Sequence, residues 1–523
     1  MMKRTGTLLL ALFLGVCFAS PCEATVYNSD GSAASVQALH NAALNGDTIT
    51  LPAGTFTWFT GVTITKAIKI AGAGSGRIIG RTLTSSTVGT GSKTFTTQSG
   101  LSISGGQTLR IVRRIIQTDS GDVSGTFMLG TVTSYSGTTL VMNITSTGGI
   151  GTYGAWYIAT EPLTTINYTT PSGAAFSITP SNGNVELSGI EFICPGPGGY
   201  AMLLNDAFPS ETLIHDCWFK VSQNEPAIRA ETNSVVIYQC SFDSPFSVVE
   251  AIMMKWETWH ISTGNLSWTT VDTLGNRDTN GNKNFYIEDC DFHYFLNSMN
   301  FDSNSRAVVR HCTFDNAGLG SHGADTSPYG TRHWEIYDNT FILEPTTNGV
   351  VLNVNYWFFD RGGTGVVTDN VMPQIVSQDW GHKRAVTLIV ENIRRNAGPY
   401  ACWTSYPAPR SAGQGYNGTS YFTDPISIWN NTGPVDSSDV GVGQYDPDGC
   451  GNNEQASIFT QITRDYFFST DSTAARPGYT KYTYPHPLRG EPTPSPTPTP
   501  TPTATPAPTP APTPRPAKKR HPH

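Results

Sequence analysis

One short motif recurs along the chain, and it constrains the fold more than any other feature of the sequence. Each copy has an aliphatic residue, two mostly polar residues, Cys or Asn, one variable residue and usually Phe. The copies are "TLIHDCWF", "VVIYQCSF", "FYIEDCDF", "VVRHCTF", "WEIYDNTF" and "GVVTDNVM". Subtracting neighbouring marker positions gives spacings of 23, 50, 22, 27 and 31, for Cys217, Cys240, Cys290, Cys312, Asn339 and Asn370. Repeats of this length predict a solenoid, and short β-rich coils with variable loops predict a β-solenoid.

The repeat resembles the coils of right-handed parallel β-helix proteins of the pectate-lyase-like superfamily. In that family, aliphatic-x-x-Asn-x-Phe marks a turn between two strands, and the Asn side chains stack from coil to coil. The resemblance extends over roughly residues 30 to 490. It implies an all-β fold, a right-handed parallel β-helix (solenoid) of the secreted bacterial type.

Four of the coils carry Cys where the family has Asn. We interpret Cys217, Cys240, Cys290 and Cys312 as a buried ladder of thiols. Small thiols are common core residues, and stacked strands hold equivalent side chains about 4.8 Å apart. Metal binding or redox chemistry is the less favoured alternative. The Phe residues that follow the markers are expected to form a core column.

The N-terminus has the layout of a secretory signal. Lys3 and Arg4 precede "TGTLLLALFLGVCFAS", an apolar run that is too short to span a bilayer, and small residues follow it. Cleavage is expected after Ala24 or Ala19. We therefore expect a protein that is secreted, extracellular or attached to the bacterial envelope, with no transmembrane segment.

Composition shifts divide the rest of the chain. The stretch "SVQALHNAALNG" predicts a short helix that caps the open end of the solenoid, and "PTPSPTPTPTPTATPAPTP" predicts an extended spacer. Between these two stretches, a segment whose expected strands are separated by Gly/Ser turns resembles the small β-modules inserted in phage-tail proteins. The expected segments are a signal peptide (1–24), a cap with the first coils (25–81), an inserted β-module (82–160), the main β-helix (161–395), a loop-rich C-terminal β region (396–490) and a disordered Pro/Thr-rich tail (491–523).

The net charge and the positions of the cysteines indicate which partners and which disulfides to expect. A formal net charge of −8 and a pI near 5.8 argue against nucleic acid or an anionic membrane as the main partner. A polysaccharide or a cell-surface glycan is the expected partner, and the sequence leaves the oligomeric state open. Cys402 and Cys450, in the loop-rich region, are the candidates for a disulfide, although nothing in the sequence proves that pairing.

Ionisable residues gather on the strand that precedes the ladder segment, where β-helices of this superfamily usually carry their site. Counting back, Asp302 lies 10 residues before Cys312, and Asp360 lies 10 before Asn370. The coil between them carries "SHGAD". The candidate catalytic residues are Asp302, His322, Asp325, Asp360, Arg361 and Arg332, with Arg306 as a candidate for substrate binding.

Such a row is compatible with two reactions and with a purely structural role. Paired carboxylates, one of them protonated, hydrolyse glycosidic bonds. Carboxylates that hold Ca²⁺ against a uronate, beside an Arg or Lys base, support β-elimination, so Ca²⁺ is expected only if the protein is a lyase. The Asp-Asp pair and Arg-x-Lys of polygalacturonases and the "WIDH" of pectate lyases are missing. Capping of turns and surface ion pairs would also explain several of these residues.

The long loop of the Cys240–Cys290 coil is rich in aromatic residues. It supplies Trp256, Trp259, His260 and Trp268, which we interpret as contacts for sugar rings. The alternative is that these Trp residues close a small core beneath a loop.

Two function hypotheses remain open at the level of sequence. The first is a secreted polysaccharide lyase or glycoside hydrolase that acts in the solenoid groove. The alternative is a non-catalytic carbohydrate-binding protein, either adhesin-like or structural in the manner of a tail spike. The fold alone does not choose between them, because β-helices serve all these roles.

Overall fold

The computed structural model describes residues 23–113, 126–161, 164–179, 183–194, 199–205, 211–221, 226–232, 234–244, 250–255, 277–278, 280–281, 283–302, 304–322, 330–343, 356–375, 385–390, 406–407, 411–416, 420–433, 437–444 and 460–490. The chain divides into two units, Met1–Tyr482 and Thr483–His523. The predicted tail, most of the predicted signal peptide, Cys402 and Cys450 lie outside the described residues.

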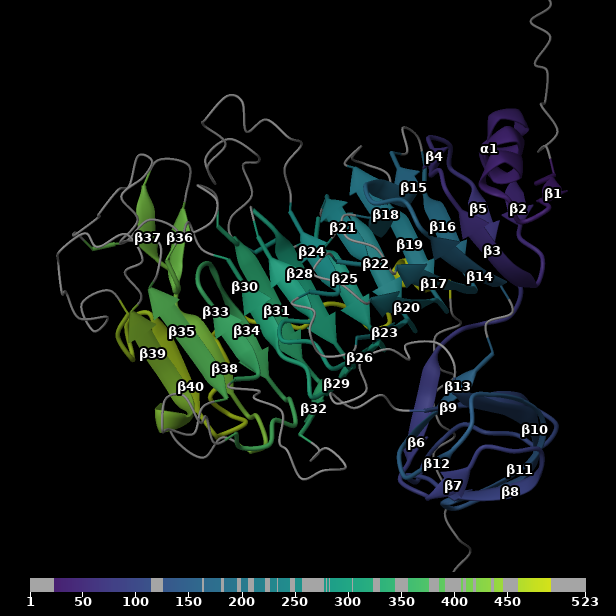
Figure 1. Cartoon of the computed structure of the whole chain (residues 1–523). Helices are drawn as coiled ribbons and strands as arrows, with labels where there is room; N and C mark the ends of the chain where they lie inside the picture. Colours follow the sequence, from purple (N-terminus) through teal and green to yellow (C-terminus); the bar gives the residue numbers. More distant parts are fainter. Residues whose placement is uncertain are drawn as a thin grey trace, which may run out of the picture. The chain divides into compact units, whose positions relative to one another are not determined.

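Three parallel sheets build the larger unit, and their strands follow one another coil by coil (Figure 1). Sheet A contains β1 (Val26–Asn28), β2 (Thr48–Thr50), β5 (Lys69–Ala71), β16 (Val185–Ser188), β19 (Thr212–His215), β22 (Val235–Tyr238), β25 (Phe285–Glu288), β28 (Arg306–Arg310), β31 (His333–Tyr337), β34 (Thr364–Thr368), β38 (Ile426–Trp429) and β40 (Tyr466–Ser469). Sheet B contains β3 (Gly54–Trp58), β14 (Thr164–Tyr168), β17 (Ile190–Cys194), β20 (Trp218–Val221), β23 (Ser241–Asp243), β26 (Asp291–His293), β29 (Thr313–Asp315) and β32 (Thr340–Ile342). Sheet C contains β4 (Val62–Ile64), β15 (Gly173–Ile178), β18 (Gly199–Asn205), β21 (Ile228–Glu231), β24 (Ile252–Met254), β27 (Met299–Phe301), β30 (Leu319–Ser321), β33 (Phe358–Asp360), β35 (Val386–Val390) and β39 (Val440–Gln444). The predicted parallel β-helix is therefore confirmed.

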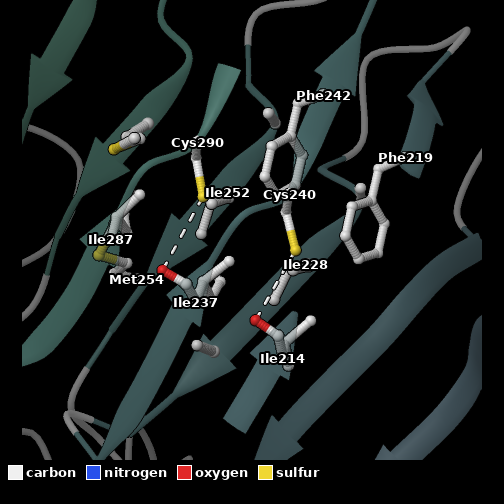
Figure 2. Packing of buried hydrophobic residues seen from close by; sticks show 14 of the residues in the cluster. Ile214, Phe219, Ile228, Ile237, Cys240, Phe242, Ile252, Met254, Ile287 and Cys290 are labelled. Atoms are coloured by element: carbon white, nitrogen blue, oxygen red, sulfur yellow. Dashed lines mark hydrogen bonds between the residues drawn. The ribbon is translucent and has the colours of Figure 1, made fainter. Parts of the chain in front are cut away.

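The repeated motif forms the corner between sheets A and B. Each marker residue follows a strand of sheet A, and its side chain donates to a carbonyl of the preceding coil. The Cys240 Sγ lies 3.7 Å from the Ile214 oxygen, and the Cys290 Sγ lies 3.8 Å from the Ile237 oxygen (Figure 2). The Asn339 Nδ2 donates in the same way to the Val309 oxygen at 2.9 Å. Thiols and amides thus occupy equivalent places in one continuous ladder, as the repeat predicts.

The Phe column is a stack of nearly parallel rings in the core. The rings of Phe219 and Phe242 lie side by side (Figure 2), with their centroids 4.7 Å apart. The centroids of Phe242 and Phe292 lie 4.8 Å apart. The column continues through Phe314 and Phe341 at similar distances. Since every second residue of a strand points inward, this stack sends the residues on either side of each Phe to the outer face of sheet B.

The predicted capping helix is present as α1 (Ala33–Ala42), next to the first coils (Figure 1). Ser32 caps it, since the Ser32 side chain accepts a hydrogen bond from the Ser35 N–H. Val36 and Ala43 are buried in the core that the solenoid strands share. The helix covers the open end of the stack, where unpaired strands would otherwise invite association with other chains.

The predicted β-module is also present, as an antiparallel sheet inserted within one coil, between β5 of sheet A and β14 of sheet B. Its strand order is β6 (Ile78–Thr82), β13 (Trp156–Thr160), β9 (Thr108–Arg113), β10 (Phe127–Ser136), β11 (Thr139–Gly148) and β8 (Gly91–Thr96), beside a small pair of β7 (Ser86–Thr87) and β12 (Thr152–Tyr153). Its ten buried residues, which include Phe95, Leu109 and Trp156, form a core distinct from that of the solenoid.

The remaining described elements are short. A hairpin of β36 (Gln414–Tyr416) and β37 (Tyr421–Thr423) and a 3₁₀ turn, η3 (Ser437–Asp439), precede the last coils. In the smaller unit, η4 (Pro487–Arg489) is capped by His486. Within the described residues, no helix combines the length and apolar character needed to cross a membrane.

Candidate functional site

Four polar residues form a row along one edge of sheet C. Lys255, Asp302, His322 and Arg361 each directly follow a strand of this sheet, namely β24, β27, β30 and β33. The strands are in register, because Met254 pairs with Phe301, and Phe301 pairs with Ser321. Because neighbouring strands of a sheet lie about 4.8 Å apart, equivalent residues of successive coils are neighbours at about that spacing. We call these four residues the sheet-C row.

Two cations hold the other two members of the row. The Lys255 Nζ lies 3.1 Å from the Asp302 Oδ2. The Arg361 Nη2 lies 2.6 Å from the His322 Nε2, and because a guanidinium can only donate, the imidazole nitrogen must accept. That assignment places the proton of the imidazole on Nδ1. The row therefore has a carboxylate and an imidazole in its middle, each held by the cation on its outer side.

Glu250 and Asn300 lie beside the row. The Asn300 Nδ2 donates to the Glu250 Oε1 at 2.5 Å, and Asn300 is on β27, two residues before Asp302. Burial raises the pKa of Glu250 to about 7, and the nearby Asp302 carboxylate raises it further, whereas Asn300, Lys255 and Arg361 oppose this shift. Near neutral pH, a large share of Glu250 thus carries a proton next to the ion-paired carboxylate of Asp302. Such a pair combines a proton donor with an anion.

Asp360 does not join the outer face of the row. It is the last residue of β33, one position before Arg361, so its side chain points to the opposite side of the sheet. Asp360 is fully buried and accepts hydrogen bonds from the Ser321 Oγ at 2.6 Å and from the Gly362 N–H at 3.2 Å. Burial raises the pKa of Asp360 to about 7. The structure therefore brings together Asp302, His322 and Arg361 and separates Asp360 from them.

The two remaining arginine candidates lie at the next corner, at the start of sheet A. Arg306 is the first residue of β28 and is fully buried. Arg332 directly precedes β31, and its exposed fraction is 2%. Its N–H donates to the Ser305 oxygen at 3.1 Å. Neither arginine belongs to the sheet-C row.

The other candidates lie outside the described residues. These are Asp325, Trp256, Trp259, His260 and Trp268. Their assignment to catalysis or to sugar contact stays a prediction. Lys255 directly precedes the Trp-rich loop in the sequence.

Lys255, Glu250 and Asn300 are not among the site residues that the sequence predicts. Counting back from Cys290 fails for this coil, because residues 256–276 lie in the sequence between β24 and the ladder residue. The sequence does contain a signal for Lys255. The segment "AIMMK" is an apolar run followed by a charged residue, and "MNFD" in the next coil likewise ends in a charged residue. Pairing those two strands would have aligned Lys255 with Asp302.

A lyase that held a uronate through Ca²⁺ would need several oxygen ligands close together. Among the described residues, no group of three or more His, Cys, Asp or Glu side chains lies close enough together to hold a metal ion. In the sheet-C row, the Asp302 carboxylate is instead engaged by Lys255. The described part of the row therefore does not fit a Ca²⁺ site.

No protein-family model matches the chain, and no curated protein matches it. Among solved structures, ORF18 of Geobacillus virus E2 is similar, with a TM-score of 0.32 and 11% identity, over 66% of this chain and 56% of that one. The Gp54 tailspike of Acinetobacter baumannii bacteriophage AP22, solved in complex with A. baumannii capsular saccharide, has a TM-score of 0.22 and 11% identity, over 85% of this chain and 73% of that one. The A-module of the Azotobacter vinelandii mannuronan C-5 epimerase AlgE4 has a TM-score of 0.24 and 11% identity, over 66% and 94%. This chain thus spans little more than half of the first protein's length, and these low scores assign no role to any residue.

Proposed function

We propose that this chain is a secreted carbohydrate-active β-helix protein that binds an anionic polysaccharide along the sheet-C row and hydrolyses it there. One observation carries the proposal: the half-buried carboxyl of Glu250, hydrogen-bonded to Asn300 and with its pKa raised to about 7, lies near the ion-paired carboxylate of Asp302 and the cations Lys255 and Arg361. The secretory signal expected at the N-terminus suits a substrate outside the cell.

The cations account for the charge of the substrate. Lys255 keeps 26% of its side chain exposed, and Arg361 is half-buried, so both are within reach of a ligand. The guanidinium of Arg361 can bind a uronate carboxylate with two parallel hydrogen bonds. A polysaccharide repeats its carboxylates along one direction, and the coils repeat their side chains along one direction. A linear anionic polymer therefore matches the row better than a compact ligand does.

The carboxyl pair accounts for the reaction. Glu250 donates its proton to the glycosidic oxygen while the bond from that oxygen to the anomeric carbon breaks and leaves its electron pair on the oxygen. A water molecule attacks the anomeric carbon and gives a proton to Asp302. Returning that proton to Glu250 through solvent restores both groups, and the sum is one polysaccharide plus one water giving two shorter chains.

A non-catalytic binding function is the second candidate, and one feature favours it. Asp302 and His322 are already engaged by Lys255 and Arg361. Such engaged pairs can exchange partners with a ligand without any bond being cleaved. The experiment below separates the two functions.

The test uses the full chain with uronate-containing and neutral polysaccharides. We expect new reducing ends from a uronate polymer without an unsaturated, ultraviolet-absorbing product. An unsaturated product would identify a lyase instead, and binding without any product would leave only the binding function. Lys255→Ala should weaken binding of the uronate polymer by about tenfold or more, since a charged hydrogen bond contributes about 1.5–3 kcal/mol.

Lys69→Ala is the matched control for Lys255→Ala. Lys69 also forms an ion pair, with Glu186 at 2.8 Å, but it lies on sheet A, and 57% of its side chain is exposed. This variant should bind the polymer as the wild type does. Equal losses in both variants would show that general surface charge, and not the sheet-C row, attracts the polymer.

A further inference from the structure

The outer face of sheet B, a different sheet from the one that carries the sheet-C row, holds a second set of ionisable side chains. In one register line along the sheet lie Lys220, Asp243, His293 and Asp315. The neighbouring outward line contains Asp291, which pairs with Thr313. A sheet face with this many charged groups is ordinarily solvated, yet Asp315 and His293 are only 1% and 3% exposed.

The β-module is what covers this face. The Ile78 N–H donates to the Ser241 Oγ at 2.7 Å, which joins β6 to sheet B. The ring of Tyr157, on β13, lies 4.4 Å from the ring of His293, and the Arg81 Nη1 lies 3.9 Å from the Asp315 Oδ2. The module thus reaches sheet B through apolar, aromatic and ionic contacts at once.

A cavity of about 250 Å³ remains between the module and sheet B. Arg81, Gln98 and Tyr157 line it from the module, and Asp291, His293 and Asp315 line it from sheet B. Both sides thus contribute polar groups.

His293 is the residue that points to a ligand. Neither nitrogen of its ring has a hydrogen-bond partner among the described residues, although the side chain is almost fully buried. The Nδ1 lies 3.7 Å from the Asp315 Oδ2, which is longer than a hydrogen bond. Leaving such a buried polar group without a partner costs about 1–3 kcal/mol, so a bound ligand that satisfies it would gain that amount.

The chemistry of the lining fits a neutral, hydroxyl-rich ligand. Among the lining residues, the Arg81 guanidinium lies opposite the Asp315 carboxylate, so the cavity does not favour a strongly charged molecule. Burial raises the pKa of Asp291 to about 7, so near neutrality this carboxyl can donate as well as accept. Hydroxyl groups also donate and accept, which suits imidazole, carboxyl and guanidinium partners together. The volume is below that of pockets for drug-sized ligands, about 300–1,000 Å³, so it fits one ring.

We propose that the cleft between the β-module and sheet B is a second binding site, which takes one ring of a neutral sugar. His293 and Asp315 hold the hydroxyl groups from the solenoid side, and Arg81 and Gln98 hold them from the module side. The site is separate from the sheet-C row and does not depend on the function proposed for that row. A sugar bound there would also link the module to the solenoid.

The test is a calorimetric titration of the full chain with glucose, galactose, mannose and N-acetylglucosamine. At least one of these should bind. His293→Ala should weaken that binding by about tenfold or more, which corresponds to the loss of about 1.4 kcal/mol. Thr340→Trp should do the same by filling the cavity, because Thr340 lines it and is exposed, so the larger side chain is compatible with folding.

Lys255→Ala is the control, and it should bind the sugar as the wild type does. Absence of binding for all four sugars would overturn the proposal. Unchanged sugar affinity in a folded Thr340→Trp variant would also overturn the proposal. This variant tests the site even if His293→Ala fails to fold. A loss of sugar binding in Lys255→Ala alone would place the sugar in the sheet-C row and overturn the second site.

Discussion

The residue before each ladder position has a left-handed backbone. Among the described residues, φ is between 52° and 59° at Asp216, Gln239, Asp289, His311, Asp338, Asp369 and Asn430. This conformation turns the chain from sheet A to sheet B. Asp and Asn tolerate it better than other residues with a Cβ atom. His311 and Asp338 thus have a structural role in turning the chain.

Gln239 is the position where this backbone strain can be tested most directly. Gln239→Gly removes a backbone strain of about 1–2 kcal/mol. Gly also makes the unfolded chain more flexible, which destabilises the folded state by about 0.5–1 kcal/mol. The free energy of unfolding should therefore stay level or rise by about 1 kcal/mol. Gln239→Val should lower the free energy of unfolding by about 1 kcal/mol or more, because a β-branched residue is strained more than Gln in the left-handed region. Urea unfolding of both variants checks this, and a Gly variant less stable than the Val variant would contradict it.

The thiol ladder gives a second prediction at this scale. Cys217, Cys240, Cys290 and Cys312 are all buried, and burial raises the pKa of Cys240 and Cys312 well above the usual value for a thiol. Hydrogen bonds with Cys240 and Cys312 lower the pKa of Cys290, so for that thiol it is burial that keeps the reagent away. Because all four sulfurs are buried, iodoacetamide should not modify these residues in the native protein. Peptide mapping by mass spectrometry before and after unfolding checks this. Modification of the native ladder within minutes would mean that the thiols are accessible.

The β-module is an element with its own core, so it should be removable. Arg77 and Thr160 lie at its base, where the Thr160 N–H donates to the Arg77 oxygen at 2.9 Å. Replacing residues 78–159 with a short Gly/Ser linker should leave a folded solenoid with a circular dichroism spectrum typical of β-sheet. The melting temperature should fall, because the outer face of Trp218 and its neighbours becomes exposed.

The same deletion should abolish sugar binding in the cleft and preserve polysaccharide binding by the sheet-C row. Calorimetry with the sugar and with the uronate polymer measures both. A deletion variant that does not fold would show that the module is part of the solenoid core, and not an independent insertion.

Sequence patterns predicted the elements better than they predicted the site. The ladder segments, the Phe column, the capping helix and the module each have local signatures, namely spacing, alternation and turn residues. The site depends on register between strands that are far apart in the sequence. Glu250 and Lys255 were missed for this reason. Asp360 lies 10 residues before Asn370, just as Asp302 lies 10 residues before Cys312. In the structure, however, Arg361 and not Asp360 occupies the position equivalent to Asp302, and a shift of one residue in a strand turns a side chain to the other face.

At the scale of the whole molecule, buried carboxyls should shape the dependence of stability on pH. Burial raises the pKa of Glu211, Glu250, Asp291 and Asp360 to about 7 in each case. A raised pKa means that the folded state binds more protons than the unfolded state. This stabilisation is complete below the unfolded pKa, about 4, and is lost as the pH rises through about 7. The free energy of unfolding should therefore fall between pH 5 and pH 7.5.

Asp360→Asn isolates one share of this effect. The amide keeps the shape of the side chain and does not ionise, so the variant should lose less stability over the same pH range. The difference should reach at most about 4 kcal/mol near pH 7, since about three pKa units separate the two states of Asp360. Thermal melts of both proteins at several pH values measure it. Parallel curves for wild type and variant would mean that Asp360 is not buried in its neutral form.

The central claim is that the sheet-C row, with Glu250 as its proton donor, hydrolyses an anionic polysaccharide. The most direct measurement is the release of reducing ends by wild type, Glu250→Gln and Glu211→Gln. Glu211 is the matched control, because burial raises its pKa to the same value of about 7, yet it lies beside sheet A. The account predicts that Glu250→Gln lowers turnover by about 100-fold or more, the usual effect of losing a general acid, while Glu211→Gln retains full turnover. Full turnover in a folded Glu250→Gln variant would contradict it.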